Sequence, residues 1–148
     1  MIAMITAKAA ISMLTVSLLP LLALCTPPQE APDVECEDVI PERIAGLEVS
    51  GPRAERTVIV DLVPIICLVQ DLHERHVRID PSLAKGKLVA RITVESTGEV
   101  AEVTIVESSF DNEAFLRKVT DVIKDSDFVF RGPSGQDTEI VVPIELRQ

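Results

Sequence analysis

Residues 87–107 read KLVARITVESTGEVAEVTIVE, and this stretch decides the fold. Apolar and polar side chains alternate through two runs, one on each side of a short turn that contains Gly98. The apolar positions are Leu88, Ala90, Ile92 and Val94 in the first run and Ala101, Val103 and Ile105 in the second. A period of two is typical of strands with one buried and one solvated face, and glycine takes the positive φ that a tight turn needs. The stretch therefore predicts a β-hairpin.

Apolar residues at helical spacing lie on both sides of this hairpin. The first pattern begins at Asp61, a candidate N-cap, and tolerates Pro64 in its first turn. It ends at Asp80, because the residue before a proline avoids the helical region. The second pattern begins at Ser109 or Asp111 as its cap. The two apolar stripes are Leu62, Ile65, Ile66, Val69 and Leu72, and Phe115, Leu116, Val119, Val122 and Ile123. Both segments are predicted to be helices with one buried face.

Two shorter stretches precede the first helix. Residues 47–51 suggest a short extended segment, and residues 57–61 suggest either a strand or the approach to the helix. Neither is assigned to the sheet.

The last strand follows the second helix, and its inward residues are Ile140, Val142, Ile144 and Leu146. A helix joins the second and third strands, so these two run parallel, while the first strand is antiparallel to both. Placing the first strand in the middle gives an antiparallel sheet with a right-handed crossover. Pro143 belongs at an edge, because proline cannot donate to a ladder on both sides. We therefore expect an α+β domain with a three-stranded antiparallel sheet of order 2-1-3 and two helices on one face.

The N-terminus has the pattern of a targeting segment. Lys8 precedes the uncharged run AAISMLTVSLLPLLAL over residues 9–24. This length fits a secretory signal and is short of the ~20 apolar residues that span a bilayer. We expect residues 1–25 to be a signal peptide or lipoprotein signal of an exported protein. The alternative is a buried helix of a cytosolic domain.

Cys25 is a lipidation candidate. Leu22-Ala23-Leu24-Cys25 resembles the box of bacterial lipoproteins, although Leu24 stands where Gly, Ala or Ser is usual. Two alternatives remain open: cleavage that releases a soluble periplasmic protein, and an uncleaved N-terminal anchor. We expect a periplasmic, cell-envelope location in a Gram-negative-type bacterium, with the membrane reached through a lipid or the N-terminal anchor.

Residues 26–45 are predicted to be an acidic, proline-rich linker. The stretch 26–42 reads TPPQEAPDVECEDVIPE, with four prolines and six acidic residues. It contains too few large apolar side chains to offset its ordering entropy. Prolines favour extended conformations, so this segment is expected to act as a semi-stiff spacer.

Charge and composition exclude some classes of partner. The formal net charge is −10, and the chain contains no Trp and no Tyr. An acidic surface repels phosphate backbones, and aromatic stacking platforms are nearly absent. Nucleic acid is therefore not expected as a partner.

Cys36 and Cys67 form the second feature of the cysteine pattern. If Cys25 is lipidated or removed, these two remain and can pair in an oxidising compartment. The alternative is that Cys67 is a small buried hydrophobic residue. No Cys/His ligand spacing is present, so no metal and no cofactor is expected.

The stretch 71–76, DLHERH, is the one candidate for catalysis. It resembles the HExxH zinc motif but is one residue short, and no third ligand accompanies His73 and His76. Ser108 and Ser109 fit a helix cap better than a nucleophile. We expect no catalytic residues and no enzyme, and keep a metal-dependent hydrolase as the third alternative for function.

Several short motifs carry no catalytic chemistry but occur in a characteristic order. They are Gly46-Leu47-Glu48-Val49-Ser50-Gly51, Asp80-Pro81-Ser82-Leu83, Gly86-Lys87-Leu88-Val89, Thr97-Gly98-Glu99-Val100, Val106-Glu107-Ser108-Ser109, Phe128 and Val142-Pro143-Ile144. In this order they resemble the C-terminal domain of TonB-type proteins, and more closely the AgmX/PglI-type C-terminal domain of envelope proteins linked to gliding motility. The resemblance covers residues 46–148 as one domain.

The chain departs from this family at its cysteines. Family members often carry a Cys-Tyr pair in the first helix and a second cysteine in the later helix. Leu72-His73 and Lys118 stand near these positions, so the usual family disulfide cannot form.

The resemblance implies a function in protein binding. TonB-type domains add an extended partner peptide to the edge of their sheet. The candidate partner-binding edge is the last strand, with Glu139, Val141, Pro143 and Glu145. The same charges and proline also suit an edge that is merely protected from self-pairing. We expect a non-catalytic module that binds an envelope protein in a TonB-like or gliding/transport-type complex. The alternative is a structural envelope lipoprotein that docks through its helices.

Overall fold

The computed structural model describes residue 36 and residues 40–129, 131–132 and 135–148. The expected signal at residues 1–25, with the lipidation candidate Cys25, lies outside the described residues, as does most of the expected linker. Within the described residues, no helix is both long and apolar enough to cross a membrane.

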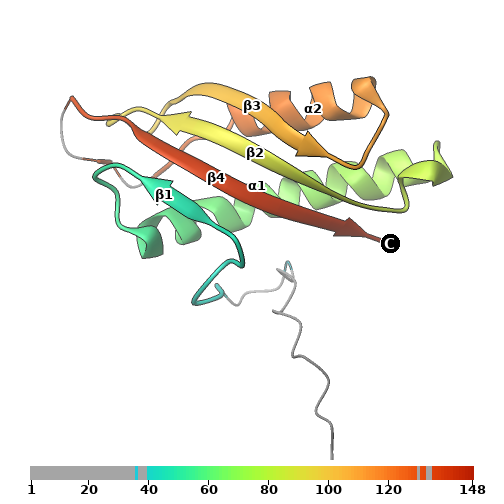
Figure 1. Ribbon diagram of the computed structural model, residues 1–148, viewed down its shortest axis with the longest axis horizontal. Helices are drawn as coiled ribbons and strands as arrows, with labels where there is room; N and C mark the ends of the chain where they lie inside the picture. The colour runs from blue at the N-terminus through green and yellow to red at the C-terminus, as the bar shows by residue number, and fades with distance from the viewer. Residues whose placement is uncertain (1–35, 37–39, 130, 133–134) are drawn as a thin grey trace, which may run out of the picture. The chain divides into compact units, whose positions relative to one another are not determined.

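The described residues form an antiparallel sheet with both helices on one of its faces (Figure 1). The sheet order is β1-β4-β2-β3. A short 3₁₀ turn, Pro81–Leu83, joins α1 to β2. The elements are β1 (Glu48–Ser50), α1 (Glu55–Val77), β2 (Lys85–Val94), β3 (Val100–Ser108), α2 (Glu113–Lys124) and β4 (Thr138–Arg147).

The α+β class and the order of the three long strands are as predicted, but the prediction of three strands was wrong. β1 is a fourth strand, and it pairs with the first part of β4. Three residues are too few to show an alternating pattern, so this strand is defined by its long-range partner rather than by its own sequence.

The core lies between the sheet and the two helices. Alternate side chains of the two central strands are fully buried toward the helices: Leu88, Ala90, Ile92 and Val94 in β2, and Ile140, Val142, Ile144 and Leu146 in β4. Phe115, Val119 and Ile123 of α2 pack against them together with the apolar stripe of α1. The side chains between these positions are exposed or half-buried, so the other face of the sheet is open.

The start of α1 differs from the prediction. The helix begins at Glu55 rather than Asp61, so Pro64 lies inside it. Asp61 is not a cap but a buried residue, and its carboxylate accepts the backbone N–H of Val129 at 3.1 Å. The ambiguous stretch before Asp61 is therefore helix, because Val58 and Ile59 face the core as members of the same stripe.

The N-cap of α2 also differs from both predicted residues. Asn112, not Ser109 or Asp111, is the N-cap, and its side-chain oxygen accepts the N–H of Phe115 at 2.9 Å. Ser109 instead extends the β3 side of the sheet, because its N–H donates to the carbonyl of Lys87.

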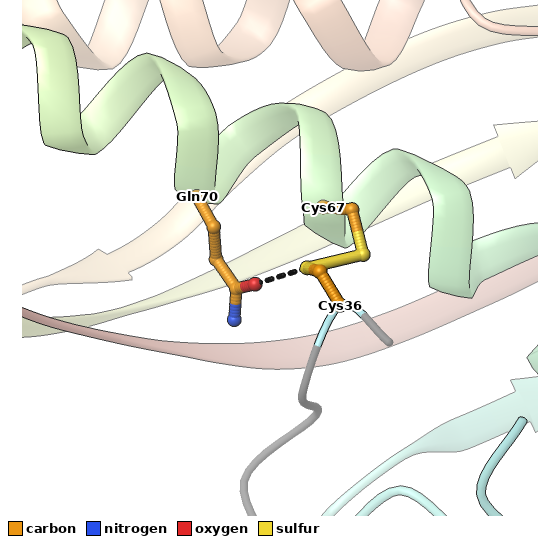
Figure 2. The surroundings of a disulfide bond; sticks show 3 residues. All are labelled: Cys36, Cys67 and Gln70. Carbon is orange, nitrogen blue, oxygen red and sulfur yellow. Dashed lines mark hydrogen bonds between the residues drawn. A yellow bond between two sulfur atoms is a disulfide. The ribbon is translucent and has the colours of Figure 1, made fainter. Parts of the chain in front are cut away.

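Cys36 and Cys67 form a disulfide, which is one of the two alternatives that the sequence left open (Figure 2). Their Cα atoms are 5.5 Å apart and their positions 31 residues apart in the sequence. The side-chain amide of Gln70, one turn further along α1, lies against the sulfur of Cys36. The disulfide closes a loop that contains β1, so it ties the chain before β1 to the outer side of α1.

Candidate partner-binding edges of the sheet

The β4 edge is partly covered, and this corrects the predicted binding edge. β1 pairs with β4 through Glu48 opposite Val141 and Ser50 opposite Glu139. Glu139 and Val141 therefore have a strand beside them, whereas Pro143 and Glu145 lie beyond the last β1 pair. Of the four residues predicted to bind a partner, two lie within the covered half of β4 and two in its second half.

The backbone groups of the second half of β4 point away from β2 at alternate positions. The N–H of Gln148 donates to the carbonyl of Ala84, on the β2 side. Because N–H and C=O change sides at every residue of a strand, Pro143 and Glu145 direct theirs to the outer side. The missing N–H of Pro143 is thus on the outer side, where it leaves the ladder with β2 intact.

Pro143 also explains where β1 ends. The next pair of the β1 ladder would place Gly46 opposite Pro143, which has no N–H to donate. Gly46 instead turns with a φ of +74°, and a Cβ there would lie 3.0 Å from Cγ of the proline ring. The chain therefore leaves β4 at this point, and no strand in the described part of the molecule covers Glu145 on its outer side.

The open face above this stretch has an apolar centre and a charged end. Val89 lies opposite Pro143 across β2 and β4, and both are half-buried. The guanidinium of Arg147 is 2.7 Å from the Glu145 carboxylate. An added strand would therefore meet a small apolar surface next to a polar end.

The β3 edge is the second exposed edge, and sequence reasoning did not select it. β3 pairs only with β2 among the described strands, over its whole length. Its register shifts twice, opposite Val89/Ala90 and Thr93/Val94. Val106, in the first of these irregularities, is 42% exposed. The predicted order 2-1-3 already placed this strand at an edge, which was the available signal.

The two histidines of residues 71–76 do not form a metal pair. His73 is 1% exposed, its Nε2 lies 2.6 Å from the carbonyl of Leu83, and its ring packs against Phe110 and Phe115. His76 contacts the carbonyl of Leu72 through Nδ1. Both rings are thus engaged with protein groups, and within the described residues no three His, Cys, Asp or Glu side chains gather to hold a metal ion.

Ser108 and Ser109 are likewise occupied by the backbone. The Ser108 hydroxyl accepts the N–H of Phe110 at 2.9 Å, and the Ser109 hydroxyl accepts the N–H of Lys87 at 2.8 Å. Neither hydroxyl contacts a histidine in the hydrogen bonds of the described residues. These hydrogen bonds hold the end of β3 to the start of β2 and to Phe110.

The pKa of Asp80 is lowered by its hydrogen bonds. The Ser82 hydroxyl, the Asn112 side-chain amide and the Ser82 N–H all donate to its carboxylate and hold its pKa below the ordinary value of 3.8. Hydrogen bonds to the charged form favour that form. Through its hydrogen bond with Asn112, Asp80 therefore links the end of α1 to the start of α2.

No protein-family model matches the chain, and no curated protein matches it. Among solved structures, the chain is similar to the NMR solution structure of the Helicobacter pylori TonB C-terminal domain, residues 179–285, with a TM-score of 0.38 and 14% sequence identity. The match covers 58% of this chain and 82% of that one. The likeness to the AgmX/PglI-type domain stays a prediction.

Proposed function

We propose that this protein is a non-catalytic interaction module of the bacterial cell envelope that binds an extended segment of another envelope protein. The segment adds as a strand to the second half of β4, beside Pro143 and Glu145. One observation carries this proposal: β1 covers β4 only as far as Val141, so the sheet continues beyond its covering strand.

Strand addition suits the chemistry of this edge. The carbonyl of Pro143 and both backbone groups of Glu145 point outward, which gives an incoming strand acceptors and a donor at the spacing of a β ladder. The half-buried Val141 and Pro143 lie on the open face, where alternate side chains of the added strand would pack. The backbone supplies affinity and these side chains supply selectivity.

The envelope location rests on two features of the chain. The Cys36–Cys67 disulfide is of the kind that persists in oxidising compartments such as the periplasm. The hydrophobic run at residues 9–24 has the length of a secretory signal. We extend the proposal to an anchor at Cys25, lipid or uncleaved, with residues 26–45 as the spacer between membrane and domain.

The proposal is tested by photo-crosslinking in intact cells. A photoreactive residue replaces Glu145 in one strain and, as the matched control, Glu107 on the β3 edge in another. The crosslinked segment of the captured protein is then synthesised as a peptide and titrated into the isotope-labelled full chain in detergent micelles.

Strand addition predicts amide shifts centred on residues 144–147, with slowed exchange of the Glu145 N–H. Shifts centred on β3 would move the site to the other edge. Shifts centred on α1 near Leu68, which is 51% exposed, would favour docking through the helices instead. Either of these two results would overturn the proposal.

A further inference from the structure

A cationic hollow lies on the open face of the sheet, next to the uncovered half of β4. It measures about 450 Å³ and is lined by Lys85, Gly86, Lys87, Ser109, Glu145 and Arg147. Lys85 lies opposite Arg147 and Lys87 opposite Glu145 in the β2–β4 ladder, so the two strands present these side chains side by side. The hollow shares Glu145 with the proposed binding edge.

The net charge of the side chains that line this hollow is opposite in sign to the net charge of the chain. Three cationic side chains face one carboxylate there, whereas the formal net charge of the whole chain is −10. The one carboxylate, Glu145, is in an ion pair with Arg147. Neither Lys85 nor Lys87 takes part in an ion pair in the part of the chain that the structure describes. Two ammonium groups are therefore available to an anion from outside.

The position of the hollow connects it to the proposed binding edge. Neighbouring strands lie ~4.8 Å apart, so a strand added to β4 would lie about 10 Å from β2. On the open face, a long acidic side chain of that strand can lean across β4, and the flexible Lys85 and Lys87 side chains can extend toward it. A residue placed opposite Glu145 would point to the hollow directly.

We infer that the hollow binds a carboxylate of the partner segment, an Asp or Glu side chain that follows the added strand. This inference rests on the proposed function and specifies its partner as an extended acidic peptide. The rest of the protein surface is acidic and repels a whole anionic membrane. A single carboxylate of a peptide meets only the cations of the hollow. Recognition of one carboxylate by two ammonium groups also fixes the register of the added strand.

The test uses two capped peptides of about eight residues, alternating Thr and Val, that differ only by Glu or Gln at one central position. Each is titrated at low salt into the isotope-labelled full chain in detergent micelles. The wild type is expected to bind the Glu peptide about five-fold more tightly than the Gln peptide. The preference should fall as salt is added, because exposed charges are screened.

Two double variants locate the effect. Lys85→Gln with Lys87→Gln should bind both peptides equally. Arg117→Gln with Lys124→Gln makes the same change of net charge on the exposed side of α2 and should keep the preference. If both double variants lose the preference for the Glu peptide equally, its cause is the net charge, and the inference is wrong.

The remaining outcomes separate this inference from the proposed function. If both peptides shift the amides of residues 144–147 equally, strand addition stands and the carboxylate site is wrong. If only the Glu peptide causes shifts, and only at Lys85 and Lys87, the carboxylate site stands and strand addition is wrong. Recruitment of the wild type, but not of the Lys85→Gln/Lys87→Gln variant, to vesicles of anionic phospholipid would assign the hollow to lipid head groups and overturn the inference.

Discussion

Along β4 the sheet is covered by a second strand over three residues and then left uncovered, whereas along β3 it is uncovered throughout but irregular and charged. The β1 ladder stops where Pro143 removes a donor. β3 has two register shifts, and Glu102 and Glu107 are exposed along it. Bulges and charges are the usual means of keeping an edge from pairing.

The difference is what the proposed function predicts for two edges with different uses. The protection of β3 extends over its full length, which suits an edge that must not associate. The protection of β4 is confined to one half, and the other half keeps regular pairing with β2 up to Arg147. A regular, straight half-strand beside a short covering strand is the better template for an incoming peptide.

Removing the disulfide should have the largest effect, because it frees the chain that carries β1. Cys36→Ser combined with Cys67→Ser opens a loop of 31 residues. The chain-entropy relation gives a loss of about 3.5 kcal/mol in the free energy of unfolding. Denaturant titration measures this loss, and hydrogen exchange should show faster exchange at Val141, which β1 covers.

Chemical reduction provides the control for that experiment. A reducing agent should lower the stability of the wild type by a similar amount and leave the double variant unchanged. Unchanged exchange at Val141 after removal of the disulfide would show that β1 holds its place on β4 by itself.

Gly98 secures the turn that leads into the β3 edge. Its φ is +98°, and a Cβ there would lie 2.1 Å from the backbone carbonyl oxygen of Phe128. Gly98→Ala is expected to lower the free energy of unfolding by about 2 to 3 kcal/mol, because strain and a backbone clash act together. Thermal unfolding measures the loss.

Gly135→Ala is the matched control for this clash. Its φ is +75°, but no heavy atom lies within 4 Å of the added Cβ. The expected loss is therefore about 1 kcal/mol, from the backbone conformation alone. Equal losses at the two glycines would show that the clash of the added Cβ with Phe128 adds nothing to the loss of stability.

Glu145→Pro should block the β4 edge while leaving the sheet intact. The Glu145 N–H points outward, so its loss spares the ladder with β2, as Pro143 already does two residues earlier. Affinity for the crosslinked peptide is expected to fall at least ten-fold, since one backbone donor is lost and the proline ring obstructs the added strand.

Glu145→Ala separates the backbone from the side chain. It removes the same ion pair with Arg147 but keeps the N–H. Its affinity should stay within about two-fold of the wild type, because an exposed ion pair contributes little. If alanine weakens binding as much as proline, the carboxylate rather than the backbone donor is responsible.

The long strands were predicted from the sequence, whereas the short strand β1 was not. The alternation of Leu88 to Val94 and of Ile140 to Leu146 predicted the central strands, because a period of two repeats often enough to be read. β1 has three residues, and only its register with β4 makes it a strand. The sequence therefore did not reveal that β1 lies beside Glu139 and Val141.

Local competition explains the misplaced start of α1. Residues 57–60 read TVIV, and β-branched residues favour strands. Burial of Val58 and Ile59 on the core side outweighs this preference, and Asp61 is then taken into the core to accept the N–H of Val129. Such a bond between residues 68 apart cannot be read from a local pattern. The disulfide was one of two alternatives, because counting the cysteines leaves the pair Cys36 and Cys67 only if Cys25 is lipidated or removed.

The smallest effect should come from lowering the pH. The loss of local stability should be confined to the start of α2, on the β3 side of the sheet. Folding lowers the pKa of Asp80 below 3.8, so the folded state binds this proton less tightly than the unfolded state. The stabilisation from Asp80 is therefore complete above its ordinary pKa and is lost as the pH falls through the lowered value. Hydrogen exchange between pH 5 and pH 3, corrected for intrinsic rates, should show loosening at the start of α2, where Asn112 donates to this carboxylate.

Asp80→Asn serves as the control, because it cannot gain a proton in this range and should show no acid step at α2. Asp80 is hydrogen-bonded to Ser82 and Asn112 rather than to the second half of β4, whose exchange should keep the same corrected rate at both pH values. Loosening of β4 together with α2 would mean that the sheet opens as one unit. The two edges would then differ in shape and charge but not in local stability. The second half of β4 would open together with the end of β3 rather than independently of it.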